Sequence, residues 1–265
     1  MTARLVVVGG GRMGEALVAG LQQTGWAKAG EIAVVEKLAA RREELKASHP
    51  RLEVVDSPVP AEGAVIAVKP SDVEEACQAV AAAGVTRVLS IAAGVRLSRL
   101  EAWLGAGKAV IRAMPNTPAL VGAGAAAIAA GPGAGEAELA WAEEILASVG
   151  VVVRVPEALM DAVTGLSGSG PAYLFLVAEA LIEAGVLVGL PRPVSEQLAI
   201  QTLLGSARLL VESLEGPEAL RAAVTSPGGT TAAGLRVLEA AGVRSAFLEA
   251  VAAATERSRQ LGASS

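Results

Sequence analysis

GGGRMG, residues Gly9–Gly14, is the stretch of sequence that decides the fold of the first part of this 265-residue chain. It follows a short β-branched run, Leu5–Val8, and opens an apolar-periodic stretch, Met13–Gln23, whose spacing is typical of a helix. A Gly-x-Gly-x-x-Gly turn between a strand and a helix is the fingerprint of a dinucleotide-binding unit, in which the helix N-terminus receives the pyrophosphate. We therefore expect this turn to bind a dinucleotide, and a nicotinamide dinucleotide in particular.

Each glycine of the motif has its own expected task. Gly9 allows the tight turn, Gly11 lets the pyrophosphate approach the backbone, and Gly14 lets the helix pack closely on the strand. Arg12, within the turn, and Met13, at the start of the predicted helix, are expected beside the cofactor. The alternative is a plain glycine-rich turn without a ligand, which the strand before it and the helix after it disfavour.

Up to about residue 155, short β-branched runs alternate with alanine-rich helical stretches. The predicted strands are Leu5–Val8, Ile32–Val35, Val65–Val68, Val88–Ile91, Val110–Arg112, Ala125–Ala129 and Val151–Val155. The predicted helices are Met13–Gln23, Leu38–Ala47, Val73–Ala82, Leu97–Leu104 and Glu136–Ser148. This alternation predicts an α/β fold, a Rossmann-type domain whose mainly parallel sheet is covered on both faces.

Past Pro156, long helical patterns replace the strand-like runs. The predicted helices are Tyr173–Leu187, Val194–Leu214, Thr230–Ala241 and Arg244–Leu261. The sequence thus predicts a dinucleotide-binding domain over residues 1–156 and an all-helical domain over residues 157–265. A small helical unit so rich in Leu, Val and Ala would be steadier packed against a copy of itself, so we expect a homodimer through these helices.

Composition and charge exclude several other classes of protein. The net charge of −5, without a long basic run, and an aromatic content of 2% argue against nucleic acid as a partner. The longest uncharged stretch, Ala113–Gly135, contains three prolines that would break a membrane span. No signal peptide is visible, and Cys77 is the only cysteine, so a cytoplasmic protein without a disulfide or a membrane partner is expected. We expect no metal site.

The choice between NADH and NADPH stays open. Glu36 ends the second predicted strand, where an acid hydrogen-bonds the adenosine ribose hydroxyls and repels a 2′-phosphate. Lys37, Arg41 and Arg42 follow at once and could instead pair with that phosphate. The two arginines could equally be the solvated start of a charged helix.

Three further segments follow predicted strands, where ligands of open α/β sheets bind. They are Ala67–Pro70, Ser90–Gly94 and Arg112–Pro118, and their small residues and prolines would allow close, rigid contact with a ribose or nicotinamide. Asn116 could hydrogen-bond a carboxamide or shape its own turn. The expected cofactor contacts from these segments are Ala67, Val68, Lys69, Pro70, Ile91, Ala92, Ala93 and Asn116.

Groups suited to acid–base catalysis are scarce. The only histidine, His49, lies beside Pro50 and is expected to be an exposed loop residue. None of the lysines lies in the predicted helical domain, whereas hydroxyacid dehydrogenases of this architecture generally carry a catalytic lysine there. Oxidation of a hydroxy acid, which needs a base, is therefore disfavoured.

The helical domain instead contains a turn rich in glycine and threonine, TSPGGTT at Thr225–Thr231. Ser226 is predicted to cap the following helix, with Pro227 at its first position. The N–H groups of Gly228, Gly229 and Thr230 would then face an anion, so the turn predicts a carboxylate site. The alternative is a merely well-capped helix, although paired glycines in a first turn are costly for helix formation.

Four stretches together carry a resemblance to a known family. The segment LRAAVTSPGGTTAAGLRVLE at Leu220–Glu239 closely resembles the signature of pyrroline-5-carboxylate reductases. DAVTGLSGSGPAYLF at Asp161–Phe175, RAMPNTPA at Arg112–Ala119 and AVKP at Ala67–Pro70 also resemble that family, in the expected order. The matches are spread over nearly the whole chain.

The resemblance implies a reaction and roles for the turn. Such enzymes reduce 1-pyrroline-5-carboxylate to L-proline with NADPH or NADH, the last step of proline biosynthesis. It implies that the substrate carboxylate is held by Ser226, Gly228, Gly229, Thr230 and Thr231, and that Thr231 hydrogen-bonds the ring nitrogen and delivers or relays the proton. It also implies a homodimer through the helical domain, with the substrate near the interface and higher homo-oligomers built from dimers.

The sequence departs from the family pattern in two places. Glu36 weakens any carry-over of NADPH preference, and Ala222 and Ala223 are small where a polar or acidic pair is expected in relatives. Two other functions are compatible with the sequence: a reductase for another small carboxylate such as a different cyclic imino acid, and a dinucleotide-sensing protein that binds cofactor without turnover. The second leaves the glycine-threonine turn unexplained.

Overall fold

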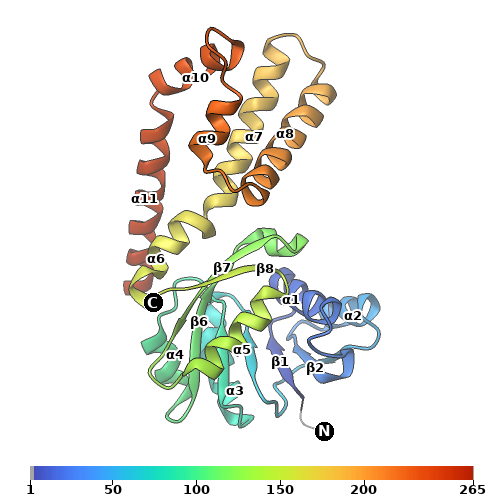
Figure 1. Cartoon of the computed structure of the whole chain (residues 1–265). Helices are drawn as coiled ribbons and strands as arrows, with labels where there is room; N and C mark the ends of the chain where they lie inside the picture. Colours follow the sequence, from blue (N-terminus) through green and yellow to red (C-terminus); the bar gives the residue numbers. More distant parts are fainter. Residues whose placement is uncertain (1–2, 265) are drawn as a thin grey trace. The chain divides into compact units, whose positions relative to one another are not determined.

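The computed structural model describes residues 3–264 (Figure 1). The strands are β1 (Leu5–Val8), β2 (Ile32–Val35), β3 (Glu53–Val55), β4 (Ala64–Ile66), β5 (Arg87–Ser90), β6 (Ala109–Met114), β7 (Gly124–Ala130) and β8 (Gly150–Arg154). The α-helices are α1 (Arg12–Gln23), α2 (Ala39–Ser48), α3 (Val73–Ala82), α4 (Leu97–Leu104), α5 (Glu136–Ala147), α6 (Met160–Val163), α7 (Gly170–Leu187), α8 (Arg192–Glu212), α9 (Pro217–Ala223), α10 (Thr230–Ala240) and α11 (Val243–Ser264). The contacts divide the chain into two compact units, residues 1–169 with 252–265 and residues 170–251.

The first unit is built on one sheet of strand order β3-β2-β1-β4-β5-β6-β7-β8. Strands β1 to β6 are parallel, β7 runs antiparallel to β6, and β8 runs parallel to β7. The order reverses at β1, which lies between β2 and β4, and the crevice outside such a switch point is where open α/β sheets bind ligands. A ligand is therefore expected at the loops after β1, β2 and β4.

Alternation along β1 explains why both faces of the sheet are covered. Leu5 and Val7 join a core formed with α1, α2 and α5, whereas Val6 and Val8 join a second core formed with α3, α4 and Met160 of α6. All four side chains are buried. Because strand side chains point to opposite faces in turn, a strand of consecutive valines can bury every residue only when helices lie on both sides.

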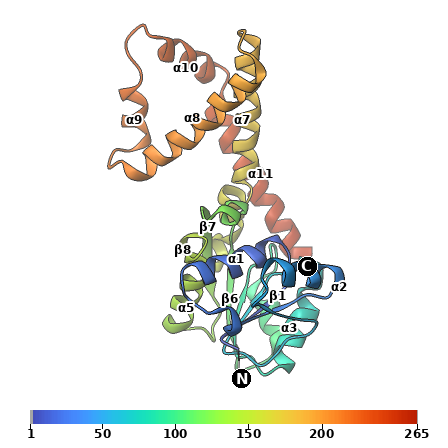
Figure 2. The same ribbon diagram turned by 90° about the vertical axis from the view of Figure 1, so that its right-hand side faces the viewer.

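The second unit contains only helices, and few of its side chains are buried. Figure 2 shows α7 and α8 meeting near the turn that joins them and diverging away from it. They approach where Gly185 faces Ser195, whose Oγ donates to the Ile182 carbonyl at 2.7 Å. A Cβ on Gly185 would lie 2.1 Å from Ser195 Oγ, so this close approach of the two helices needs glycine. No residue of α7, which lies wholly within the described range, is buried.

The predicted elements agree with the structure to within a few residues. The α/β class, the two-sided cover of the sheet and the helical second part are confirmed. Among the strands and α-helices of the described residues, three were not predicted: β3 and the short helices α6 and α9. β3 is only three residues long and α6 and α9 four and seven, so their periodic patterns are too short to detect.

Candidate dinucleotide and substrate sites

The glycine turn has the geometry that its sequence predicts. Gly9 has a φ of +113°, and a Cβ there would lie 2.5 Å from the Ala67 carbonyl oxygen. A Cβ on Gly14 would lie 2.1 Å from the Gly9 carbonyl oxygen, so only glycine lets α1 pack this closely on the turn. The expected structural roles of Gly9 and Gly14 are therefore confirmed.

Gly11 differs from Gly9 and Gly14 because the space beside its Cα is open. It is the N-cap residue of α1, without a side-chain cap, and a Cβ built on it meets no atom within 4 Å. The first N–H groups of a helix have no partner within the helix, and its N-terminus carries partial positive charge. The residues present therefore fit a pyrophosphate beside Gly11, at the start of α1.

The Glu36 carboxylate is hydrogen-bonded to the glycine turn. Its Oε2 accepts a hydrogen bond from the Gly10 N–H at 3.1 Å, and its Oε1 accepts one from the Leu38 N–H at 2.9 Å. These two bonds fix the carboxylate at the carboxyl end of β2 and leave lone pairs on both oxygens for ribose hydroxyls.

Arg41 and Arg42 bond to the backbone that surrounds this carboxylate. Arg41 Nε donates to the Gly10 carbonyl at 2.9 Å, and its Nη2 pairs with Glu15 of α1 at 2.5 Å. Arg42 Nη1 donates to the carbonyls of Glu36 and Lys37 at 2.9 and 2.8 Å. Arg41 thus holds the glycine turn and Arg42 holds the loop after β2, so the two arginines are not simply a solvated helix start.

A cavity of about 510 Å³ opens beside Glu36 and is called the Glu36 cavity below. Its walls come from the ends of four neighbouring strands and from α3: Val8, Gly9, Gly11, Val35, Glu36, Lys37, Leu38, Asp56, Ser57, Pro58, Ala67, Val68, Lys69, Asp72, Glu75, Ala76 and Ala79. An apolar floor with carboxylates at the rim suits an adenosine whose ribose is read by hydrogen bonds.

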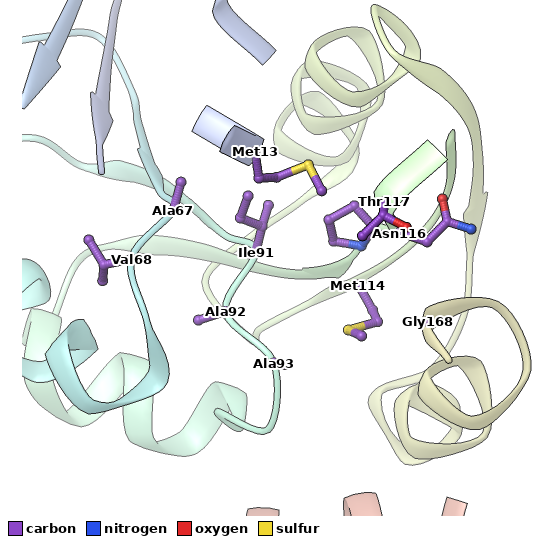
Figure 3. Close-up of a pocket in the computed structure, with 11 residues that line it drawn as sticks. Met13, Ala67, Val68, Ile91, Ala92, Ala93, Met114, Asn116, Thr117 and Gly168 are labelled. Carbon is purple, nitrogen blue, oxygen red and sulfur yellow. The ribbon is translucent and has the colours of Figure 1, made fainter. Parts of the chain in front are cut away.

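A second cavity of about 280 Å³, called the Asn116 cavity, follows the ends of β4, β5 and β6 (Figure 3). It is lined by Met13, Ala67, Val68, Ile91, Ala92, Ala93, Met114, Pro115, Asn116, Thr117 and Gly168. In Figure 3, Val68 lies on one side, Asn116 and Gly168 lie on the other, and Ile91 and Ala92 lie between them. Both cavities have Ala67 and Val68 in their walls, so they are neighbours at the same edge of the sheet, as an extended dinucleotide requires.

Asn116 is held by both ends of its amide. Its Nδ2 donates to the Ser167 carbonyl at 3.0 Å, and its Oδ1 accepts from the Ala125 N–H at 2.8 Å. The side chain therefore ties the loop after β6 to β7 and to the π-helical turn Thr164–Gly168, and its second amide hydrogen remains for a ligand.

Most of the predicted cofactor residues line one of the two cavities, and three line neither. Gly14 supports the turn from behind, while Arg12 and Pro70 begin α1 and the 3₁₀ turn Pro70–Asp72. The structure adds wall residues that the sequence reasoning missed, chiefly Asp56, Glu75, Met114 and Gly168. Met114 and Gly168 carried a signal, since they lie in the segments Arg112–Pro118 and Asp161–Phe175 that the sequence singles out, whereas Asp56 and Glu75 carried none.

The prediction for the start of α10 was wrong in part. The helix begins at Thr230 with Gly229 as its N-cap residue, not at Pro227 with Ser226 as the cap. Ser226–Gly229 forms a β-turn, in which the Gly229 N–H donates to the Ser226 carbonyl at 3.0 Å and Gly228 has a φ of +69°. Proline second and glycine third suit such a type II turn, and the positive φ stops a helix from starting earlier.

The anion site at this turn is consequently displaced by a few residues. The Gly229 N–H is taken, whereas the N–H groups of Thr230, Thr231 and Ala232 have no acceptor within residues 3–264. Thr231 is half-buried and Thr230 is exposed. The turn therefore offers a helix N-terminus beside two threonine hydroxyls, and it lies in the second compact unit.

His49 and Cys77, the two other side chains with reactive groups, lie outside both cavities and are held by their neighbours. His49 is not an exposed loop residue as expected: it follows α2 and its Nε2 lies 3.3 Å from Glu15 Oε1. Burial tends to raise the pKa of Glu15, but the hydrogen bonds and charges of Arg41 and His49 outweigh it and lower the pKa below 4.5. Burial raises the pKa of the Cys77 thiol to about 12, so it is unreactive at neutral pH. Within residues 3–264, no group of three or more His, Cys, Asp or Glu could hold a metal ion.

Family models and curated relatives agree on where this chain belongs. Residues 157–261 match the model described as pyrroline-5-carboxylate reductase dimerisation, and residues 4–94 match NADP oxidoreductase coenzyme F420-dependent. The chain is 48% identical to the pyrroline-5-carboxylate reductase of Synechocystis sp. over 99% of both chains. It belongs to the pyrroline-5-carboxylate reductase family. The enzyme of that name from Mycobacterium tuberculosis is 43% identical over 98% of this chain and 97% of its own.

Solved structures of the family share the whole fold. A pyrroline-5-carboxylate reductase from Coxiella burnetii is 35% identical and superposes with a TM-score of 0.92 over 98% of this chain and 99% of its own. A Plasmodium falciparum pyrroline carboxylate reductase, solved with NADP bound, is 30% identical with a TM-score of 0.85 over 98% of both chains. The resemblance inferred from the sequence motifs and the Rossmann-type fold are confirmed.

Proposed function

We propose that this protein reduces 1-pyrroline-5-carboxylate to L-proline with NADPH or NADH, the last step of proline biosynthesis, in the cytoplasm. The observation that carries the proposal is the similarity to pyrroline-5-carboxylate reductases over the full length of the chain. The two cavities that meet at the glycine turn support it, because they provide the dinucleotide site that the reaction needs.

The division of tasks follows from the residues. When bound, NAD(P)H supplies the hydride that the imine carbon accepts. The Gly9–Gly14 turn and the Glu36 and Asn116 cavities would hold and orient it, with the apolar side chains of Met13, Ile91 and Met114 excluding water from the Asn116 cavity. An imine also needs one proton at nitrogen but no strong base, which agrees with the absence of lysine from the helical part of the sequence.

The start of α10 is the proposed substrate site. The free N–H groups of Thr230, Thr231 and Ala232 and the helix dipole would receive the substrate carboxylate. A Cβ built on Gly228, in the preceding turn, would meet no atom within 4 Å. Thr231 Oγ1 would hydrogen-bond the ring nitrogen and deliver or relay the proton. Positioning and electrostatic stabilisation are then the main catalytic contributions of the protein.

Turnover tests the proposal directly. Purified protein mixed with pyrroline-5-carboxylate and NADPH or NADH should consume the reduced cofactor and form proline. Binding of cofactor without turnover of this substrate would contradict the proposal and favour a dinucleotide-sensing protein. Turnover of a different cyclic imino acid alone would point to a related reductase.

Thr231→Ala tests the proposed proton donor. Removing a positioned donor costs on the order of 10²-fold or more in kcat, while the affinity for the dinucleotide should not change. Thr231→Ser should recover most of the rate because it retains the hydroxyl. Thr225→Ala is the matched control, since its Oγ1 donates to the Arg221 carbonyl at the end of α9. An unchanged kcat in Thr231→Ala would show that the proton comes from elsewhere.

A homodimer through the helical domain is part of the proposal, with higher homo-oligomers built from dimers. Within residues 3–264 one helical stretch, Glu157–Leu187, is long and apolar enough to cross a membrane by length and composition alone. On α7, Phe175 is 64% and Leu187 87% exposed. The stretch falls inside the segment that matches a dimerisation family model, so a second copy is the proposed cover for this surface.

A further inference from the structure

We propose that the protein prefers NADH to NADPH, because Glu36 and its surroundings exclude a 2′-phosphate from the Glu36 cavity. The inference rests on the proposed dinucleotide site but not on the identity of the substrate. It deepens the proposed function by naming the hydride donor, for which a relative solved with NADP bound is the contrasting case.

The position of Glu36 is fixed before any cofactor binds. Both carboxylate oxygens accept backbone N–H groups, from Gly10 within the glycine turn and from Leu38. The carboxylate therefore cannot swing away from the end of β2 without leaving two N–H donors unpaired. Ribose hydroxyls can donate to its remaining lone pairs, whereas a 2′-phosphate in the same place would set like charges side by side.

The arginines that could have received a 2′-phosphate are engaged elsewhere. Arg41 bonds the Gly10 carbonyl and pairs with Glu15 and with Glu44, the latter at 3.0 Å. Arg42 donates to two carbonyls at the end of β2. Turning Arg41 toward a ligand would break the bonds that its Nε, Nη1 and Nη2 make. Turning Arg42 would break the two bonds of its Nη1 to the loop after β2, whereas its Nε and Nη2 make no hydrogen bond within residues 3–264.

The rim of the Glu36 cavity is acidic as a whole. Four carboxylates line it, from Glu36, Asp56, Asp72 and Glu75, against the two ammonium groups of Lys37 and Lys69. Asp56 follows β3, the neighbour of β2 on the side away from β1, so the strand flanking Glu36 there adds a further negative charge. A 2′-phosphate would enter this negative rim with two more charges.

Lys37 and Lys69 are the two cations that line this cavity and could face a 2′-phosphate. Lys37 pairs with Glu75 at 2.5 Å, but both side chains are largely exposed, and such pairs contribute little. Lys37 could therefore turn to a ligand at small cost, and it is the group to test. Lys69 makes no ion pair within the described residues, but it follows β4, which lies two strands from β2, or about 10 Å at ordinary strand spacing.

Binding without substrate gives the most direct test. Titration calorimetry of the apoprotein with NAD⁺ and NADP⁺, at one ionic strength, should give a Kd for NADP⁺ about tenfold or more above that for NAD⁺. Steady-state kinetics with NADH and NADPH should give the same order of preference. An NADP⁺ Kd equal to or below the NAD⁺ Kd would overturn the inference.

Three variants show which group is responsible. Glu36→Gln should lower the ratio of the NADP⁺ Kd to the NAD⁺ Kd about tenfold, because it removes the charge while keeping one acceptor for a backbone N–H. Glu75→Gln should lower it by up to about fivefold through release of Lys37, with the bonds of Glu36 intact. Glu43→Gln, the matched control, removes a charge from an exposed pair with Lys46 outside the cavity and should leave the ratio unchanged.

The outcomes separate this inference from the proposed function. If Glu36→Gln melts at a much lower temperature, Glu75→Gln still tests the charge of the rim without disturbing Glu36. A shift in Glu43→Gln as large as in Glu36→Gln would show that net charge alone matters, which would overturn the assignment. Preferential binding of NAD⁺ by a protein that does not turn over pyrroline-5-carboxylate would refute the proposed function and leave this inference standing.

Discussion

Substituting Gly11 by alanine should separate cofactor binding from folding. The residue has a φ of −71° and a ψ of −179°, which alanine adopts freely, and its Cβ would meet no atom within 4 Å. Alanine is a poorer N-cap residue than glycine, at a cost of up to about 1 kcal/mol. It also restricts the unfolded chain, which favours folding by about 0.4–1 kcal/mol. The two effects nearly cancel, so the melting temperature should change by no more than about 2 °C.

The effect on binding should be far larger. The methyl group would occupy the open space at the N-terminus of α1 where the pyrophosphate has to approach the backbone. A hydrogen bond to a charged group is worth about 1.5–3 kcal/mol. Loss of one such bond would raise the Kd about 10- to 150-fold, and it should do so for NAD⁺ and NADP⁺ alike, since both carry the pyrophosphate.

Calorimetry with each dinucleotide and thermal unfolding of the same samples check both halves of this prediction. An unchanged Kd in Gly11→Ala would refute the assignment of the turn as the pyrophosphate cradle. A clear fall in melting temperature would instead show that the space around Gly11 is not open in the folded protein.

Three further changes test other parts of the molecule. Gly14→Ala places a Cβ 2.1 Å from the Gly9 carbonyl, so thermal melts should show a net loss of roughly 1–2 kcal/mol after the gain in helix propensity; an unchanged melt would mean that the helix can move away freely. Arg41→Met removes a partner that helps lower the pKa of Glu15, and a lowered carboxyl pKa contributes stability that is present above the ordinary value of 4.5 and lost as the pH falls through the folded pKa. In urea, Arg41→Met should therefore lose more free energy of unfolding, relative to the unsubstituted protein, at pH 7 than below pH 4.5. The loss that remains at low pH is the part due to the bond to Gly10, and a loss independent of pH would contradict the Glu15 pairing. Phe175→Glu should dissociate the proposed dimer in light scattering at unchanged helicity by circular dichroism, whereas a retained dimer would mean that this face of α7 is not in the interface.

Much of the fold could be predicted because its signals are local. Leu5–Val8, Ile32–Val35, Val73–Ala82 and Leu97–Leu104 were predicted with their observed bounds, since runs of β-branched or helix-spaced residues lie between glycine, proline and polar breakers. The sequence also indicated that Gly9–Gly14 is a dinucleotide turn. By contrast, the start of α10 depended on whether Ser226–Gly229 would form a helix turn or a type II turn, and the local pattern permitted both.

Contacts between residues distant in sequence could not be predicted in the same way. Asn116 meets Ser167 across 51 residues, and Glu36 meets Gly10 across 26. Such pairs depend on which strands become neighbours, and strand order is a property of the whole sheet. The sequence could therefore place Asn116 and Glu36 at strand ends but could not name their partners.

The sequence by itself determined that this chain has a strand–glycine turn–helix unit, an alternating α/β first part, a helical second part and the motifs of its family, because each of these is written in neighbouring residues. Only the tertiary structure decided which partners Glu36, Lys37, Arg41 and Arg42 have. These four charges stand within seven residues and could have formed either an acidic ribose reader or a basic phosphate site. The fold brings Gly10 and Glu15 to Glu36 and Arg41, so the carboxylate is fixed in place and the guanidinium is engaged. The physical reason is that a charged group's role depends on the partners that packing gives it, and those partners come from α1 and the glycine turn.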